Sequence, residues 1–164
     1  MKAQYRNTFR DIMAFCLYHY TRSPFVLGSF AFFLIVFSIL FVKALPTEAS
    51  ATEKVIVFLV LELCAAALFA GLMASSVVLS MISRKNKTIL TDHTLILSEQ
   101  NFVEETSYNR TEQTWSSVQK LVRTRGHIFI YVAQYMAHVI PRRAFANETE
   151  WNAFFDYCKT HQTK

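Results

Sequence analysis

Two long apolar stretches dominate the first half of the chain. Residues 26–42 contain no charged side chain, and residues 55–82 contain only one, Glu62. A helix rises about 1.5 Å per residue, so roughly 20 apolar residues cross the ~30 Å hydrocarbon core of a bilayer. The pattern predicts a transmembrane helical hairpin over residues 25–83, with a short outer loop over residues 43–54.

Two other interpretations of the apolar stretches are less consistent with the chain. In a soluble bundle the remaining residues would have to cover both helices on every face, and they are too few to do so easily. A cleaved signal peptide would have a shorter basic region and an apolar region of about 7–15 residues. Membrane insertion is therefore the favoured interpretation.

The segment before the first stretch has a helical period. Its apolar side chains recur every three or four residues between residues 5 and 20: Phe9, Ile12, Met13, Cys16 and Tyr20. This spacing predicts a helix along the inner membrane surface, or one packed on a cytoplasmic domain. A cytoplasmic extension of the first span is the open alternative. We assign residues 1–24 as a cytoplasmic amphipathic N-terminal segment.

Past the second stretch the period changes from helical to alternating. Residues 94–98 and 102–108 are predicted as strands, and a turn is expected at residues 109–112. Two β-rich runs, residues 127–132 and 135–140, are predicted to pair as a hairpin. The pattern indicates a small antiparallel sheet.

A helix is predicted to close this region. Asn147 is an N-cap residue, and Glu150 follows three positions later, as in a capping box. The apolar face of the helix recurs with helical spacing at Trp151, Phe154, Phe155 and Cys158. Residues 88–164 are thus predicted to form a cytoplasmic β-rich domain with a C-terminal helix, and the fold class is an α+β membrane protein.

The charge pattern predicts the orientation. The segment before the first span carries a net charge of +3, the outer loop is neutral, and three basic residues follow the second span: Arg84, Lys85 and Lys87. Positive residues near the ends of spans mark the cytoplasmic side. Both termini are therefore expected in the cytoplasm of a multi-pass protein of the bacterial inner membrane.

The same count argues against nucleic acid as a partner. From residue 88 to the end, eight basic side chains balance eight acidic ones, so the overall net charge of +5 lies in the membrane-flanking segments. A nucleic-acid binder would concentrate its basic excess on the soluble domain. Contact with the anionic headgroups of the lipid bilayer explains the positive charge of the membrane-flanking segments.

The chain carries no recognisable catalytic or metal-binding motif. Its histidines and cysteines lack zinc-ligand spacing, and its three glycines form no phosphate-binding loop. Glu104 and Glu105 are adjacent on a predicted strand, so they point to opposite faces. His127 and His138 could meet across the predicted hairpin, although ordinary hydrogen-bonded strand histidines are favoured. We expect no enzymatic activity, no metal and no cofactor.

A few polar residues remain as candidate contacts. Arg142 and Arg143 form the one compact basic site, and Arg6 and Arg10 lie one turn apart on the predicted N-terminal helix. These arginines are candidates for contact with a partner or lipid headgroup, and simple solvation is the alternative. Glu62 is either an intramembrane polar site or, as we favour, a residue at the outer interface near Lys43 or Lys54.

Small residues recur along the second stretch at helical spacing. The two rows are Ala66, Ala70, Ala74 and Ala67, Gly71, Ser75. Such rows let helices approach closely in lipid. They are expected either to pack the two spans of one chain together or to form a homodimer contact.

Two stretches carry a resemblance to a known family. One is residues 15–20 (FCLYHY) followed by Ser23, and the other is residues 115–120 (WSSVQK) with residues 140–145 (IPRRAF) and the closing helix. In these residues the chain resembles the YcxB-like family of bacterial two-span membrane proteins. The resemblance implies an inner-membrane protein with a cytoplasmic domain similar to pleckstrin-homology-like folds, and it implies no enzymatic activity.

The leading functional hypothesis follows from these points. It is a non-enzymatic inner-membrane protein that presents a small cytoplasmic interaction domain to a protein or lipid partner. The alternative is an immunity or accessory protein that acts through its transmembrane hairpin on a toxin or transporter. A small transporter or channel subunit that uses Glu62 is a third and weaker hypothesis.

Overall fold

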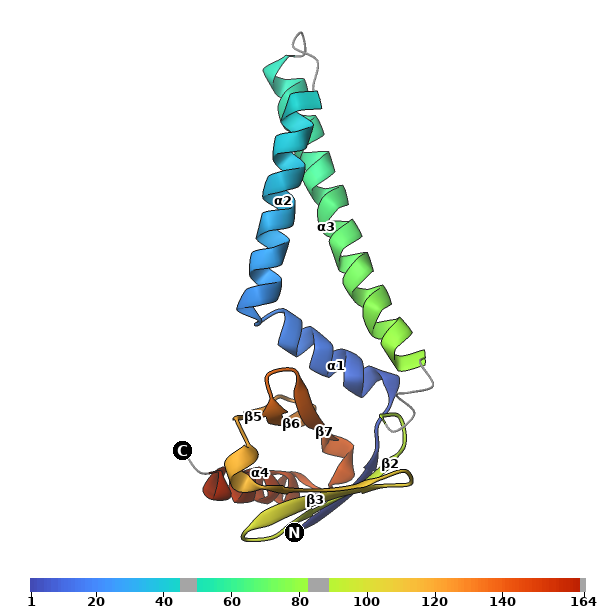
Figure 1. Cartoon of the computed structure of the whole chain (residues 1–164), viewed down its shortest axis with the longest axis vertical. Helices are drawn as coiled ribbons and strands as arrows, with labels where there is room; N and C mark the ends of the chain where they lie inside the picture. Colours follow the sequence, from blue (N-terminus) through green and yellow to red (C-terminus); the bar gives the residue numbers. More distant parts are fainter. Residues whose placement is uncertain (45–49, 83–88, 163–164) are drawn as a thin grey trace. The chain divides into compact units, whose positions relative to one another are not determined.

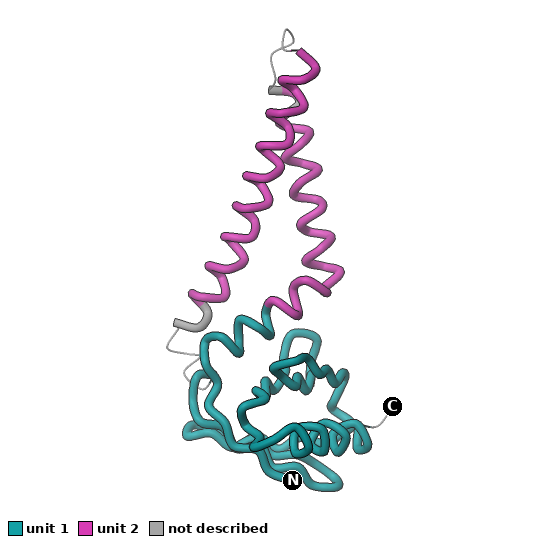
Figure 2. The backbone as a smooth tube through the Cα atoms, turned by 180° about the vertical axis from the view of Figure 1, so that it is seen from behind, with its two compact units in different colours: residues 1–16, 81–164 teal, residues 17–80 magenta. Residues whose placement is uncertain are grey.

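The computed structural model describes residues 1–44, 50–82 and 89–162, and its elements follow one another as shown in Figure 1. The chain divides into two compact units, which Figure 2 colours separately. The sheet unit comprises Met1–Cys16 and Met81–Lys164, and the hairpin unit comprises Leu17–Ser80. The first 16 residues thus belong with the C-terminal region rather than to a separate segment.

The first sheet of the sheet unit contains four antiparallel strands in the order β1-β2-β3-β4. Their bounds are β1 Lys2–Arg6, β2 Asp92–Leu97, β3 Asn101–Thr106 and β4 Arg110–Thr114. Strand β1 pairs with β2 from Lys2↔Ile96 to Arg6↔Asp92, and the terminal amino group donates to the Leu97 carbonyl oxygen at 2.7 Å. The N-terminus is therefore fixed as an edge strand.

Two sequence predictions were wrong in this sheet. The helix predicted from residue 5 begins only at Phe9 (α1, Phe9–Tyr20), because Tyr5 and Arg6 belong to β1. The turn predicted at residues 109–112 occupies earlier positions, and β4 begins at Arg110. In both places pairing with a neighbouring strand overrides the local pattern.

The second sheet has three antiparallel strands, β5 (Lys120–Arg123), β6 (His127–Ala133) and β7 (Met136–Pro141). The predicted β6–β7 hairpin is confirmed, with Ile130 opposite His138 in the register. Short 3-10 turns, η2 (Trp115–Ser117) and η3 (Arg142–Ala144), precede β5 and follow β7.

Helix α4 (Glu148–His161) closes the sheet unit as predicted. The Asn147 side chain accepts a hydrogen bond from the Glu150 backbone N–H at 2.9 Å, which is the expected N-cap. The apolar face of α4 meets side chains from both sheets in one core, whose buried members include Leu95, Phe102, Trp115, Ile128, Ile130, Ile140, Trp151 and Phe154. The antiparallel sheet structure with a C-terminal helix is therefore confirmed, in the form of two sheets around one core.

The hairpin unit consists chiefly of two long helices, α2 (Pro24–Ala44) and α3 (Ala51–Ile82). They meet through aromatic side chains, with the Phe30 and Phe69 ring centroids 5.0 Å apart. Both helices are long and apolar enough to cross a membrane by length and composition. Almost none of either apolar window is buried inside the protein, and large side chains such as Phe32 and Leu63 point outward.

Candidate functional site

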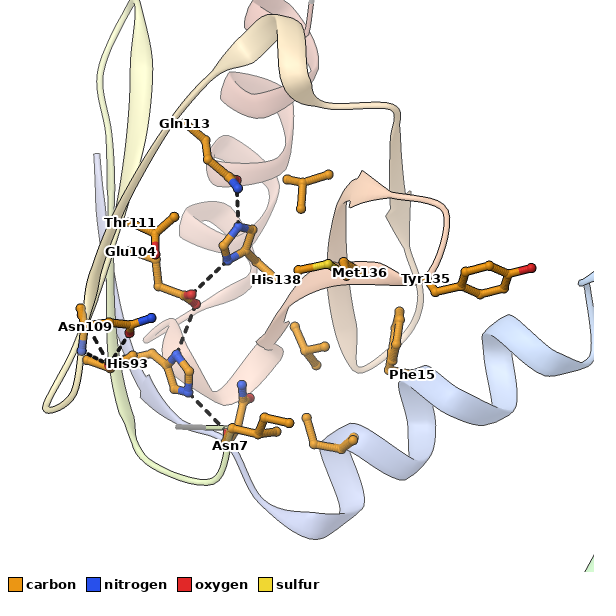
Figure 3. Close-up of a pocket in the computed structure, with 16 residues that line it drawn as sticks. Asn7, Phe15, His93, Glu104, Asn109, Thr111, Gln113, Tyr135, Met136 and His138 are labelled. Carbon is orange, nitrogen blue, oxygen red and sulfur yellow. Dashed lines mark hydrogen bonds and ion pairs between the residues drawn. The ribbon is translucent and has the colours of Figure 1, made fainter. Parts of the chain in front are cut away.

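A chain of four polar side chains runs between the two sheets of the sheet unit (Figure 3). The two carboxylate oxygens of Glu104, on β3, each accept from a histidine: His93 Nδ1 on β2 lies 3.0 Å away and His138 Nδ1 on β7 lies 3.1 Å away. The other nitrogen of His138 is 3.0 Å from the Gln113 side-chain oxygen, and His93 Nε2 is 3.3 Å from the Ile89 carbonyl oxygen. The network therefore links strands β2, β3, β4 and β7.

The surroundings of Glu104 favour its charged form. Burial of the carboxyl acts to raise its pKa, but hydrogen bonds and charge interactions with His138 and His93 outweigh that effect and lower the pKa to about 2. Glu105, the next residue, is half exposed and pairs with Arg110 at 3.4 Å. The prediction that the two glutamates point to opposite faces is confirmed.

A cavity of about 370 Å³ lies against this polar chain. Side chains of α1 and of the β6–β7 hairpin line it opposite the chain, among them Ile12, Phe15, Val132, Met136 and Val139. The polar lining comes from the first sheet and from Asn7. One side of the cavity is therefore apolar and the other offers hydrogen-bonding groups.

Asn7 is an exception to the hydrogen bonding around the cavity. Its side chain is only 6% exposed, and its backbone N–H donates to the Thr91 carbonyl oxygen at 3.3 Å. Its side-chain oxygen has no hydrogen-bond partner among residues 1–44, 50–82 and 89–162. An unsatisfied buried acceptor is unusual and calls for an explanation.

A second buried carboxylate, Asp11, holds α1 to the sheet unit. Its two oxygens accept from the Arg143 guanidinium at 2.8 and 2.6 Å, and one also accepts from His127 Nε2 at 2.8 Å. The Thr8 N–H and hydroxyl donate to the other oxygen at 2.7 and 2.6 Å. Burial acts to raise the pKa of Asp11, but these hydrogen bonds, that from Arg143 first, hold it well below its usual range.

The arginines singled out from the sequence lie on neighbouring segments of the sheet unit. Arg143 binds Asp11 and also donates to the Arg6 carbonyl oxygen at 2.7 Å, while Arg142 pairs with Glu148 at 2.9 Å. The Arg142 backbone N–H donates to the Gly126 carbonyl oxygen at 2.8 Å, which brings the β5–β6 turn and Arg125 to the same region. We call Arg6, Arg10, Arg125, Arg142 and Arg143 the arginine cluster.

The members of the arginine cluster differ in whether they already form an ion pair with a carboxylate of the protein. Arg143 and Arg142 are each about half exposed and are engaged by carboxylates. Arg6, Arg10 and Arg125 are exposed and have no ion pair in the described part of the chain. These last three guanidinium groups are available to an external anion.

In the hairpin unit Glu62 pairs with α2. The Ser38 hydroxyl donates to the Glu62 carboxylate and lies 2.8 Å from the Leu34 carbonyl oxygen. The sequence favoured a place for Glu62 at the outer interface near Lys43 or Lys54, and the structure gives it Ser38 as a hydrogen-bond partner. In the second predicted row, Ala67, Gly71 and Ser75 are exposed, so this row faces away from α2.

The pairing of both buried carboxylates was not predicted from the sequence. His127 and His138 do not meet across the hairpin: they bind Asp11 and Glu104 respectively. The partners are separated by up to 132 residues, as for Asp11 and Arg143. No local spacing could have revealed them, although an aspartate or glutamate inside an otherwise apolar or strand pattern is a usable signal.

No group of three or more His, Cys, Asp or Glu side chains suited to a metal ion occurs in residues 1–44, 50–82 or 89–162. The three cysteines are free thiols. The polar networks are closed by internal hydrogen bonds, and the exposed chemistry is that of the arginine cluster and the cavity.

The structure defines a class of protein in which a small two-sheet domain with a C-terminal helix is joined to a long apolar helical hairpin. Residues 97–158 match the model of the family described as YcxB-like protein, which covers β3 to α4 almost entirely. The chain therefore contains a YcxB-like domain, and the resemblance stated from the sequence is confirmed there. No curated protein and no solved structure matches the chain.

Proposed function

We propose that this is a non-enzymatic, multi-pass protein of the bacterial inner membrane that holds a YcxB-like, pleckstrin-homology-like domain at the cytoplasmic surface to bind anionic lipid headgroups. The arginine cluster carries the proposal. It gathers basic side chains from three parts of the chain, around residues 6–10, 125 and 142–143, into one region of the sheet unit.

The outward-facing apolar side chains of α2 and α3 support insertion. Leaving side chains such as Phe32 and Leu63 in water is unfavourable by about 25 cal/mol for each Å² of apolar surface. Lipid removes that cost, since a bilayer core is as apolar as the side chains themselves. Basic residues flanking both helices on the sheet-unit side favour a cytoplasmic domain.

The sheet topology supports an even number of membrane crossings between strands β1 and β2. Arg6, before the hairpin unit, lies opposite Asp92, after it, in one antiparallel pair. Paired strands occupy the same side of any membrane, so the chain between them must leave and return. Two spans and two cytoplasmic termini satisfy that requirement.

Charge arithmetic supports an anionic ligand. The five arginines of the cluster meet two internal carboxylates, Asp11 and Glu148. Arg6, Arg10 and Arg125 are exposed and lie outside these ion pairs, and the cluster keeps an excess of positive charge even with Asp92 opposite Arg6. Each basic residue near an anionic membrane surface contributes about 1 kcal/mol of binding free energy.

The test uses the full chain in a neutral detergent. Native mass spectrometry counts bound phosphatidylglycerol against phosphatidylcholine for the wild type, for Arg6→Ala/Arg125→Ala, and for Lys2→Ala/Lys159→Ala. All four positions are exposed, and both variants remove two positive charges. We expect the arginine variant to lose roughly tenfold or more in phosphatidylglycerol affinity and the lysine variant to stay near wild type.

Equal losses in the two variants would contradict the proposal, because they would show a general charge effect. Retained lipid binding, together with crosslinking of the cluster to an acidic protein in native membranes, would assign the cluster to a protein partner instead.

A second candidate is favoured by the outward face of α3. The exposed row of Ala67, Gly71 and Ser75 fits close contact with another helix, as a homodimer or as an immunity or accessory protein acting on a toxin or transporter. Gly71→Leu would disrupt such a contact, and crosslinking in native membranes would then lose its product. Unchanged crosslinking would count against this candidate.

A further inference from the structure

We propose that the cavity of the sheet unit binds a small, neutral, mostly apolar molecule that carries one hydrogen-bond donor, such as an alcohol, a phenol or a primary amide. The site is separate from the arginine cluster and needs no anionic group. It is formed entirely by residues of the sheet unit, between α1, the first sheet and the β6–β7 hairpin (Figure 3).

The size and lining of the cavity suit a small ligand. About 370 Å³ lies at the lower end of the ~300–1,000 Å³ range of small-molecule sites. Ile12, Phe15, Val132, Met136 and Val139 offer an apolar surface for the body of the ligand. Such sites usually combine apolar walls with a few convergent polar groups, and the polar side here faces those walls.

The ionisable side chains on the polar side already engage one another. The two carboxylate oxygens of Glu104 bind His93 and His138. The second ring nitrogens of these histidines lie within hydrogen-bond distance of the Ile89 carbonyl oxygen and the Gln113 side-chain oxygen. A charged ligand would therefore find no unengaged group of opposite charge among the described residues that line the cavity.

Asn7 is the reason that the proposed ligand must carry a hydrogen-bond donor. Asn7 lines the cavity, and its side-chain oxygen is buried without a hydrogen-bond partner in the described residues. An unsatisfied buried acceptor is unfavourable, so a donor supplied by a bound molecule stabilises the site. An O–H or N–H group on the ligand meets this need, and a ligand without a donor does not.

The experiment compares two fluorinated probes on the full chain in nanodiscs, with empty nanodiscs as the reference for partitioning. The probes, 4-fluorobenzyl alcohol and 4-fluorobenzyl methyl ether, share an aromatic body, and only the alcohol can donate. Binding is followed by ¹⁹F NMR. We expect saturable binding of the alcohol, with an affinity about three- to tenfold higher than that of the ether.

Two variants test whether the probes bind in the cavity of the sheet unit. Asn7→Leu keeps a similar volume and removes the unpartnered acceptor, so it should abolish the preference for the alcohol and raise the thermal midpoint of the empty protein. Ala137→Phe, which fills the cavity from β7, should abolish saturable binding of both probes. Because Asn7 lies outside the arginine cluster, Asn7→Leu should leave phosphatidylglycerol binding unchanged.

Three results would overturn the proposal: no saturable binding of either probe, equal affinities for the two probes, or an Asn7→Leu variant that keeps the preference and melts earlier. The last result would make Asn7 a structural residue. None of these results would bear on the arginine cluster, so the two proposals fail independently.

Discussion

The two units of this protein place the same kinds of apolar side chain in opposite environments: the sheet unit buries them, and the hairpin unit exposes them. In the sheet unit Phe102, Phe129 and Phe154 are each about 1% exposed, whereas Phe32 of the hairpin unit is 69% exposed. Polar groups show the reverse contrast, because the sheet unit buries two networked carboxylates. The carboxylates of the described hairpin helices are Glu62, which pairs with Ser38, and Glu53, which is exposed near the start of α3. Under the proposed location, water surrounds one unit and lipid the other.

The contrast shows what stabilises each unit. In water, burial of apolar area supplies most of the free energy of folding, and buried charges are tolerated only with partners. In lipid, outward apolar side chains gain little from packing, and internal backbone hydrogen bonds become the main requirement. Mutations of the same chemical type should therefore have very different effects in the two units.

The largest expected effect comes from the core. Phe154→Ala should lower the free energy of unfolding of the sheet unit by about 4 kcal/mol, through lost burial and the cavity that remains. Phe32→Ala, the same change on the outer face of α2, should alter it by less than about 0.5 kcal/mol. Trp115 and Trp151, both buried in the sheet unit, report unfolding by fluorescence. Similar losses in both variants would contradict the contrast.

Asp11 comes next. Asp11→Ala removes a carboxylate that is 3% exposed and leaves Arg143 and His127 without their partner, at a cost of about 3 kcal/mol. Asp156→Ala, at an exposed position of α4, is the control and should be nearly neutral. Denaturant unfolding of the full chain measures both. A silent Asp11→Ala would show that α1 is not held by this network.

The pH dependence tests Glu104. Its pKa is lowered to about 2, so its contribution to stability is complete above the unfolded pKa of about 4.3 and disappears as the pH falls toward 2. We expect Glu104→Gln to be less stable than wild type by between about 2 and 3 kcal/mol at neutral pH. The two proteins should converge near pH 2. A constant difference across this range would contradict the assignment.

Loss of the hydrogen bond between Ser38 and Glu62 in the hairpin unit should have the smallest effect on stability. Ser38→Ala removes the only donor that the structure gives to the Glu62 carboxylate, within the described residues. Interhelical hydrogen bonds in membranes contribute about 0.6 kcal/mol on average, so the expected loss is of that size. Titration with sodium dodecyl sulfate measures helix separation, with Ser76→Ala, whose hydroxyl binds its own helix, as the control. A loss above about 2 kcal/mol would contradict an interhelical hydrogen bond of ordinary strength.

Much of the fold follows from periodicity alone. The two apolar helices, the β6–β7 hairpin and the Asn147 cap of α4 were all predicted, because each depends on residues close in sequence. Strand β1 was missed because its pairing partner follows the whole hairpin unit. Its short, mixed sequence (KAQYR) carries no strong preference of its own.

The candidate sites were less predictable for the same reason. Arg6, Arg10, Arg142 and Arg143 were singled out as separate pairs, and only the fold brings Arg6 next to Arg143 and adds Arg125. The cavity and Asn7 had no sequence signal. Long-range contacts create both sites, and a single sequence does not reveal such contacts.

The most direct test of the contrast between the units uses the native cysteines. Cys64 is exposed on α3 and Cys158 is buried, where loss of solvation raises its thiol pKa to about 12. Sealed membrane vesicles are treated with a water-soluble, impermeant maleimide, and mass spectrometry assigns the label. We predict that Cys64 stays unmodified until detergent and denaturant are added. Rapid labelling of Cys64 in intact vesicles would show that water surrounds α3 and would contradict the proposed location of the hairpin unit.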